Sequence, residues 1–142
     1  MVTVFVSAFL HIIKLEHQKY DLNKGSKLMN KRELIDLVLH ETTSFEDYPF
    51  NGEHSHETIE WTAIKHLSNK KIIALIFEKD HELLIDLKLT PEHGEIMRKT
   101  RGVFPGYHMN KTHWNTISVN QTDVGLTELV NMIHESAVLT GK

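Results

Sequence analysis

The sequence predicts an α+β domain in which one mainly antiparallel β-sheet packs against helices. Three observations predict it: a capped amphipathic helix follows residue 29, three strand-like segments follow one another between residues 59 and 89, and a hairpin and a last helix complete the chain. With 142 residues, 40% of them apolar and 25% charged, the chain can bury a core without metals or disulfides. We therefore expect one domain over residues 29–142, preceded by an N-terminal extension and linker over residues 1–28.

The extension contains an apolar segment, residues 2–13, followed by a polar one. The apolar segment is too short for a transmembrane helix, which needs about 20 residues. No basic residue precedes it and no small-residue cleavage site follows it, so a signal peptide is not indicated. We expect no membrane association. Two explanations of the segment stay open: a strand or helix that docks on the domain, or translation from an upstream start with the domain itself beginning at Met29.

The first helix of the domain is predicted to begin after Asn30, a suitable N-cap with Glu33 at the capping-box position. Leucine, isoleucine and valine between residues 34 and 39 give it one wide apolar face. The helix should end near residues 42–43. The DYPF segment at residues 47–50 then forms a rigid elbow, because proline disfavours helix in the residue before it.

Three strands in an antiparallel meander are expected next. Apolar residues alternate with others around Ile59 to Ile64, as in a half-buried strand. Residues 72–77 form a continuous apolar run, which is typical of a central strand covered on both faces. After a polar turn, leucine and isoleucine alternate with other residues from 83 to 89, which predicts the third strand.

A second helix is predicted to begin after Thr90, whose hydroxyl is an N-cap and is followed by proline and glutamate. Arg98, Lys99 and Arg101 lie at its other end, where the helix dipole favours cations, so the helix itself explains part of their placement. Gly102 should stop this helix.

A hairpin and a final helix complete the domain. In the second hairpin strand, Ile117 and Val119 would occupy one face, with residues 114, 116 and 118 on the other. Thr122 or Asp123 is the expected N-cap of the last helix, whose apolar residues recur at helical spacing as far as Val138.

The richest stretch of the sequence is PGYHMNKTHWNT, residues 105–116, which we call the hairpin stretch. It gathers two aromatic rings, two imidazoles, a lysine and two asparagines behind a Pro-Gly pair that permits a sharp turn. No Asp or Glu occurs from residue 96 to residue 122, although the whole chain has a formal net charge of -3. This composition indicates a contact surface for an anionic or polar partner. Lys111 is expected at the hairpin tip, with few packing duties.

The hairpin stretch, with DYPF at residues 47–50 and KKIIALIF at residues 70–77, resembles the signature of the MmcQ/YjbR family of small bacterial proteins. The resemblance covers about residues 29–139. It implies an α-β-β-β-α-β-β-α two-layer sandwich, related to secretion chaperones and often compared with frataxin, that binds DNA through a double-wing arrangement. One departure is Ala137 after Ser136, where members of the family commonly have tyrosine.

We therefore expect a non-enzymatic protein that binds DNA weakly and largely independently of sequence. The residues expected to contact DNA are Arg98, Lys99, Arg101, Tyr107, His108, Asn110, Lys111, His113 and Trp114. The alternative is a chaperone-like or adaptor module that binds a protein, which the acidic net charge and the related fold favour. A structural role stays open for individual residues, because Tyr107 and Trp114 can cover the edge of the sheet and asparagines can bond turn backbone.

The sequence contains no catalytic or cofactor motif: no P-loop, dinucleotide fingerprint, HExxH or nucleophile elbow. The absence of cysteine excludes disulfides and thiolate chemistry, and we expect a cytoplasmic protein. Among eleven histidines, His54 and His56 are the best metal candidates, because residues i and i+2 of a strand share a face. No third ligand has a spacing that fixes it, so we expect a polar loop there, and neither a metal nor a cofactor.

Overall fold

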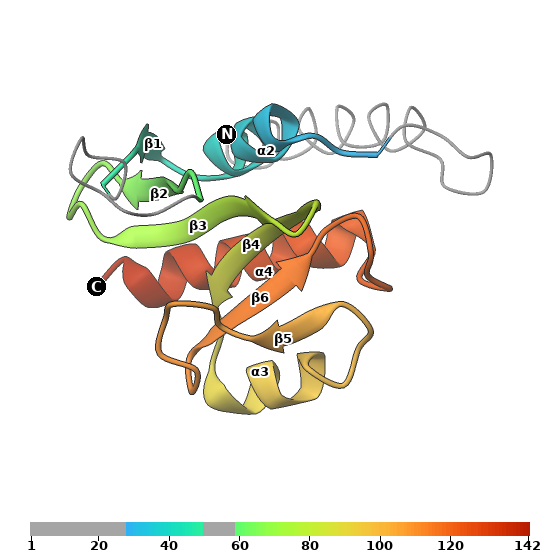
Figure 1. The fold of residues 1–142 in the computed structure, drawn as a ribbon. Coiled ribbons are helices and arrows are strands. Elements are labelled where there is room, and N and C mark those ends of the chain that lie inside the picture. Colours follow the sequence, from blue (N-terminus) through green and yellow to red (C-terminus); the bar gives the residue numbers. More distant parts are fainter. Residues whose placement is uncertain (1–27, 50–58) are drawn as a thin grey trace.

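A computed structural model describes residues 28–49 and 59–142, and these ranges contain three helices and one sheet of six strands. The helices are α2 (Lys31–Glu41), α3 (Pro91–Met97) and α4 (Leu126–Thr140). The strands are β1 (Ser44–Asp47), β2 (Thr62–His66), β3 (Ile72–Lys79), β4 (Glu82–Lys88), β5 (Val103–Pro105) and β6 (Trp114–Ser118). The sheet is antiparallel throughout, in the order β1-β2-β3-β4-β6-β5 (Figure 1). The predicted α+β class and the predicted meander of β2, β3 and β4 are confirmed.

Two of the sequence predictions concern residues that the structure does not describe. Residues 1–27, nearly all of the expected extension, are one case, and the pair His54 and His56 is the other. Within the described ranges, none of the helices combines the length and apolar character needed to cross a bilayer. In the same ranges, no group of three or more His, Asp or Glu side chains is arranged to hold a metal ion.

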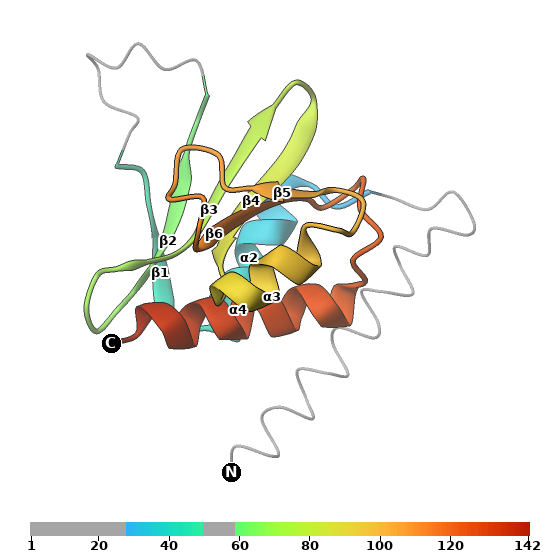
Figure 2. The ribbon, with the colours of Figure 1, turned by 90° about the horizontal axis from the view of Figure 1, so that it is seen from below.

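The main core lies between the sheet and the helices. Figure 2 shows α4 running along one side of the sheet, and α2 and α4 contact each other and pack on β3. Fully buried side chains of this core include Leu34 and Val38 of α2, Ile76, Ile85 and Ile117 of the sheet, and Met132 and Ile133 of α4. Since burial of one such side chain stabilises a fold by about 1.5–3 kcal/mol, this layer is the main source of stability.

The opposite face of the sheet carries a smaller aromatic cluster. The rings of Trp61 and Phe77 have centroids 4.4 Å apart, and the ring of Tyr107 is stacked at 5.7 Å from that of Phe77. Met109 also packs against this cluster. Residues 106–113, the connection between β5 and β6, are thereby attached to the sheet face that lies opposite the helices.

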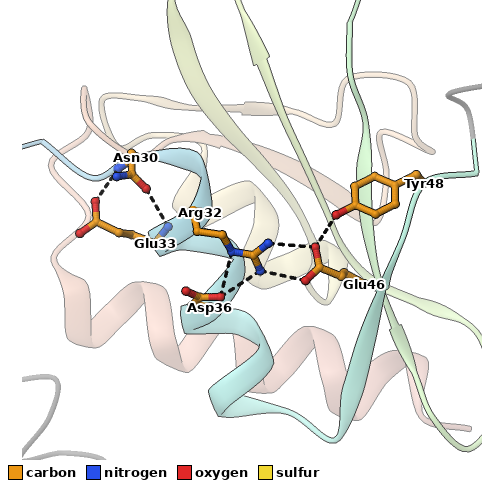
Figure 3. A network of polar contacts seen from close by, with 6 residues as sticks. All are labelled: Asn30, Arg32, Glu33, Asp36, Glu46 and Tyr48. Atoms are coloured by element: carbon orange, nitrogen blue, oxygen red, sulfur yellow. Dashed lines mark hydrogen bonds and ion pairs between the residues drawn. The ribbon is translucent and has the colours of Figure 1, made fainter.

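The start of α2 matches the prediction. The Asn30 side chain accepts a hydrogen bond from the Glu33 amide at 2.8 Å, and the Glu33 carboxylate accepts one from the Asn30 amide at 3.0 Å (Figure 3). The helix ends at Glu41 with Thr42 as its C-cap. The capping box predicted from the Asn30 and Glu33 spacing is therefore confirmed.

Strand β1 is absent from the sequence prediction. It has four residues, all half-buried, and pairs with Ala63 to His66 of β2. Arg32 of α2 holds it from outside: two guanidinium nitrogens donate to the two carboxylate oxygens of Glu46, and Tyr48 donates to the same carboxylate (Figure 3). A four-residue segment with Phe45 as its only apolar residue has too little periodicity to be recognised, and its stability comes from these distant partners.

Strand β2 is more buried than its alternation suggests. It begins at Thr62 instead of Ile59, and the four consecutive residues 61–64 are all buried. Ala63 faces the aromatic cluster while Ile64 faces the helix core. Because β1 and β3 flank it and both of its faces are covered here, β2 is an interior strand rather than a half-buried one.

Two boundary predictions for α3 and α4 need correction. The N-cap of α3 at Thr90 is confirmed, but this helix ends at Met97, and Gly102 lies beyond it in a turn with a positive φ of 84°. The N-cap of α4 is Gly125 rather than Thr122 or Asp123, because the Thr122 hydroxyl is engaged with the Arg101 carbonyl. Val138 lies within α4 as predicted but is 67% exposed, because it is on the outward side of the helix, whereas Ser136 and Thr140 on the inward side are buried.

Ser136 joins α4 to two strands at once. Its fully buried hydroxyl donates to the Ile73 carbonyl at 2.6 Å and accepts from the Lys88 amide at 2.9 Å. It thus satisfies backbone groups of β3 and β4 that strand pairing leaves open.

We expect Ser136→Ala to lower the free energy of unfolding by about 1–3 kcal/mol, because it leaves a buried amide and a buried carbonyl without a partner. Chemical denaturation of the variant and the parent measures this. Thr127→Ala, an exposed change on the same helix, serves as the control and should stay within about 0.5 kcal/mol. Equal losses in the two variants would contradict the bridging contribution of Ser136.

Candidate nucleic-acid interface

The loop of residues 106–113 is folded back by its own backbone contacts. The Gly106 amide donates to the Trp114 carbonyl at 2.8 Å, and a Cβ on Gly106 would stand only 2.8 Å from that oxygen. The carbonyl of Asn110 accepts from the Trp114 amide, and its side chain accepts from the Thr112 amide. Gly106 and Asn110 therefore shape the loop, which explains their presence without any ligand.

A buried carboxyl group lies beneath this loop. Asp86 of β4 is fully buried, and Thr116 of β6, its partner in the register, donates its hydroxyl to one carboxyl oxygen at 2.5 Å. The same threonine oxygen accepts from the Tyr107 amide at 2.9 Å. Among the residues that the structure describes, none donates a hydrogen bond to the other carboxyl oxygen, Oδ2. Burial raises the pKa of Asp86 to about 7, although the Thr116 hydrogen bond and the nearby charge of Lys111 act in the opposite direction.

Lys111 is tied to the loop rather than free at its tip. Its ammonium donates to the Gly106 carbonyl at 3.1 Å, and its charge lowers the pKa of Asp86. The expectation of few packing duties is therefore wrong for the ammonium group. The residue is nevertheless exposed, so its charge also reaches solvent.

The three rings of the loop are placed differently. Tyr107 is half-buried in the aromatic cluster, whereas His108 is exposed, has a positive φ of 63° and meets the Tyr107 ring edge-on at 4.3 Å. His113 is half-buried, and its carbonyl accepts from the Leu89 amide at 2.9 Å. Of these three rings, His108 presents the most accessible one.

Trp114 has a mainly structural role. Its side chain is only 9% exposed, at the start of β6. A ring buried to this degree does not offer an open face on which a base could stack. The small accessible part of Trp114 lines the pocket described below.

The cations at the end of α3 do not gather with Lys111. The Arg101 guanidinium lies 3.0 Å from the Asp123 carboxylate, and Arg98 donates to the Asn115 side chain. Lys99 is exposed. In Figure 1 the connection from α3 to β5 and the loop from β5 to β6 lie at opposite ends of β5. The structure therefore brings together the loop residues of the expected interface but separates them from the Arg101 end.

Four lysines converge at the loop end of the sheet instead. A pocket of about 410 Å³, which we call the lysine pocket, lies between the turn from β2 to β3, the end of β4, the start of β6 and the last turn of α4. Its lining residues are Lys65, Lys70, Lys71, Ile72, Lys88, Trp114, Leu139 and Thr140. Figures 1 and 2 both show the end of α4 beside the turn from β2 to β3.

The four ammonium groups differ in how they are engaged. Lys65 pairs with the Asp47 carboxylate at 2.6 Å. Lys70 donates to the Leu67 carbonyl at 3.2 Å, and Lys71 donates to the backbone oxygen of Lys142. The Lys88 side chain has no hydrogen bond or ion pair among the described residues. Among the described residues, Asp47 is the one side-chain carboxylate paired with these four cations, so lysine side chains dominate the polar lining of the pocket.

Sequence reasoning did not identify these lysines as a group. Their separations along the chain carry no motif, and only the doublet Lys70 and Lys71 in a predicted turn is a local signal. The strand register assembles them: Lys65 pairs with Ile72, and Lys88 pairs with Trp114. A reliable register for β4 and β6 would have been needed to find the pocket, and the sequence supplies none.

Comparisons with known proteins agree with this architecture. A family model described as YjbR matches residues 37–136, from α2 into α4. The Bacillus subtilis protein YyaQ, whose description is "uncharacterized", is 28% identical over 123 residues that cover 80% of this chain and 99% of YyaQ. A crystal structure of a Pseudomonas syringae protein matches with a TM-score of 0.65 and 31% identity, over 79% of this chain and 99% of that one. Deinococcus radiodurans protein DR2400, with a DUF419 domain, matches with a TM-score of 0.59 and 28% identity, over 78% of each chain.

The raised pKa of Asp86 predicts that the stability of the fold depends on pH. Because the pKa of Asp86 is about 7 in the folded protein and near 3.9 in an unfolded chain, the folded state retains this proton while the unfolded state loses it. Stability from this group should therefore fall as the pH rises from about 4 to about 7, by about 4 kcal/mol, and level off above.

Asp86→Asn cannot ionise, so its unfolding free energy should lack this decline. Denaturation of both proteins at several pH values measures the difference between their profiles. Asp80→Asn, which removes an exposed carboxylate in the turn between β3 and β4, is the control and should keep the parental profile. Parallel profiles for Asp86→Asn and the parent would show that burial does not raise this pKa.

Proposed function

The chain belongs to the YjbR family, and from that premise we propose that it is a non-enzymatic protein that binds DNA weakly and largely independently of sequence. The observation that carries the proposal is the convergence of four lysines on one pocket beside the hairpin loop. Lysine ammonium groups recognise phosphate as point charges, and phosphate contacts supply most sequence-independent affinity for DNA.

The accessible loop residues extend this surface. His108, Asn110 and Lys111 are exposed, and the loop that carries them leads directly into Trp114 on the pocket wall. These side chains offer hydrogen bonds and one further charge to a sugar-phosphate backbone. None of them is part of a helix or a ribbon shaped to enter the major groove, so the arrangement supports backbone contact rather than base recognition.

The net charge limits the affinity. A chain with a formal net charge of -3 repels DNA from most of its surface, and the lysine pocket is a local exception. We expect dissociation constants in the micromolar range or weaker, as for other non-specific contacts at physiological salt.

A protein partner is the second candidate, and one observation favours it. Phe104 of β5 is 49% exposed and lines a pocket of about 180 Å³ together with Pro105, Tyr107 and Lys79. An accessible aromatic ring in a shallow hollow is typical of a site for a protein side chain. This site supports a chaperone-like or adaptor function.

Titration of a labelled duplex at several salt concentrations tests the DNA proposal. If each of the four lysines neutralises one phosphate, log K should fall with log salt with a slope of about -3.6, roughly a hundredfold between 50 and 200 mM. The double variant Lys71→Gln and Lys88→Gln should lower the slope to about -1.8, because two contacts are lost.

Lys31→Gln, which removes one charge from α2 outside the pocket, is the control and should keep the parental slope. Absence of binding by the parent at low salt would refute the DNA proposal and favour the protein partner. A parental slope in the double variant would place the phosphate contacts elsewhere on the surface.

A further inference from the structure

The lysine pocket is concave, and its cations come from separate elements. Lys65 projects from β2, Lys70 and Lys71 from the following turn, and Lys88 from the end of β4. Its volume of about 410 Å³ is within the range of small-ligand sites. Cations that reach one open pocket from separate elements can meet a single anionic group there, in addition to the backbone contacts proposed above.

We propose that the lysine pocket binds a phosphate monoester at the 5′ end of a DNA strand. This inference rests on the proposed DNA-binding function and names the part of the DNA that the pocket recognises. A terminal phosphate projects beyond the last sugar and can enter a hollow, whereas an internal phosphodiester is held between two sugars on a convex duplex.

The charge of the pocket fits a monoester. At neutral pH a phosphate monoester carries a charge of about -1.5 to -2 and has three acceptor oxygens, whereas each backbone phosphodiester carries a single charge. Lys70, Lys71 and Lys88 line the same pocket; the ammonium groups of Lys70 and Lys71 donate to the backbone oxygens of Leu67 and Lys142, and that of Lys88 has no partner among the described residues. Several convergent donors on one dianion are a stronger and more specific arrangement than one lysine on one diester.

The pocket lining also has an apolar part. Ile72, Leu139 and the small accessible part of Trp114 line the pocket together with the lysines. They provide a surface for the terminal sugar, while the limited exposure of Trp114 leaves no open ring face for base stacking. Recognition should therefore depend on the phosphate and not on the terminal base.

Lys88 is the best-positioned of the four donors. Its backbone amide is bonded to the buried hydroxyl of Ser136, and it pairs with Trp114 across the sheet. The start of its side chain is thus fixed, while its ammonium has no partner among the described residues. A ligand at this site does not have to displace an internal contact of Lys88.

Two hairpin DNAs of one sequence test the proposal, each with a single blunt end that carries either a 5′-phosphate or a 5′-hydroxyl. Fluorescence anisotropy at low salt should show that the full chain binds the phosphorylated hairpin at least about fivefold more tightly than the hydroxyl-ended hairpin. Lys88→Gln should reduce this ratio towards one, whereas Lys31→Gln, with the same change of charge, should preserve it.

Each of the other outcomes refutes one part of the proposal. Equal binding of both hairpins would overturn the end-binding inference and leave the DNA proposal standing, whereas absence of binding to either would refute both. If Lys88→Gln kept the parental ratio of the two affinities, the lysine pocket would not be the site that binds the terminal phosphate. Competition by deoxyadenosine 5′-monophosphate as strong as by the phosphorylated hairpin would assign the pocket to a free nucleotide and overturn the DNA-end assignment.

Discussion

The pairing of β4 with β6 is the constraint on which the rest of the structure depends. After β4 the chain forms α3 and the edge strand β5, then returns so that β6 lies between β5 and β4. This register places Thr116 opposite Asp86 and Trp114 opposite Lys88. Because side chains alternate between the faces of a sheet, a register shift of one residue would turn Thr116 and Trp114 towards the helix core and break these contacts. The position of β6 beside β4 therefore determines both the surroundings of the buried carboxyl group of Asp86 and the placement of Lys88 and Trp114 in the lysine pocket.

The polar composition of the hairpin stretch has a double origin. Gly106, Asn110 and Lys111 form contacts within the loop, and Thr116 links the loop to Asp86. These contacts hold the loop against the aromatic cluster, while His108 and part of Lys111 remain accessible. A dense run of polar and aromatic residues thus indicates an ordered loop as much as a binding surface.

The fold could be predicted from the sequence where the determining contacts are local. The capping box of Asn30, the Thr90 cap and the apolar run of β3 each act within a few residues, and all were recognised. Strand β1 was not recognised, because its stability comes from Arg32 and from β2 rather than from its own pattern. The site follows the same division: the hairpin stretch is contiguous and visible, whereas the lysine pocket is assembled from segments far apart in the chain. Charge counts along the sequence cannot show such a convergence, since Lys65 and Lys88 look like ordinary solvated strand ends.

The short edge strand β5 has a consequence for how this sheet meets other molecules. It contributes three residues, and the last of them, Pro105, has no backbone N–H to donate. An edge of this kind cannot template a further strand, which protects the protein against edge-to-edge aggregation. Growth of the sheet by a partner's backbone is blocked at this edge. Recognition there must come through side chains, so it can be altered residue by residue without disturbing the sheet.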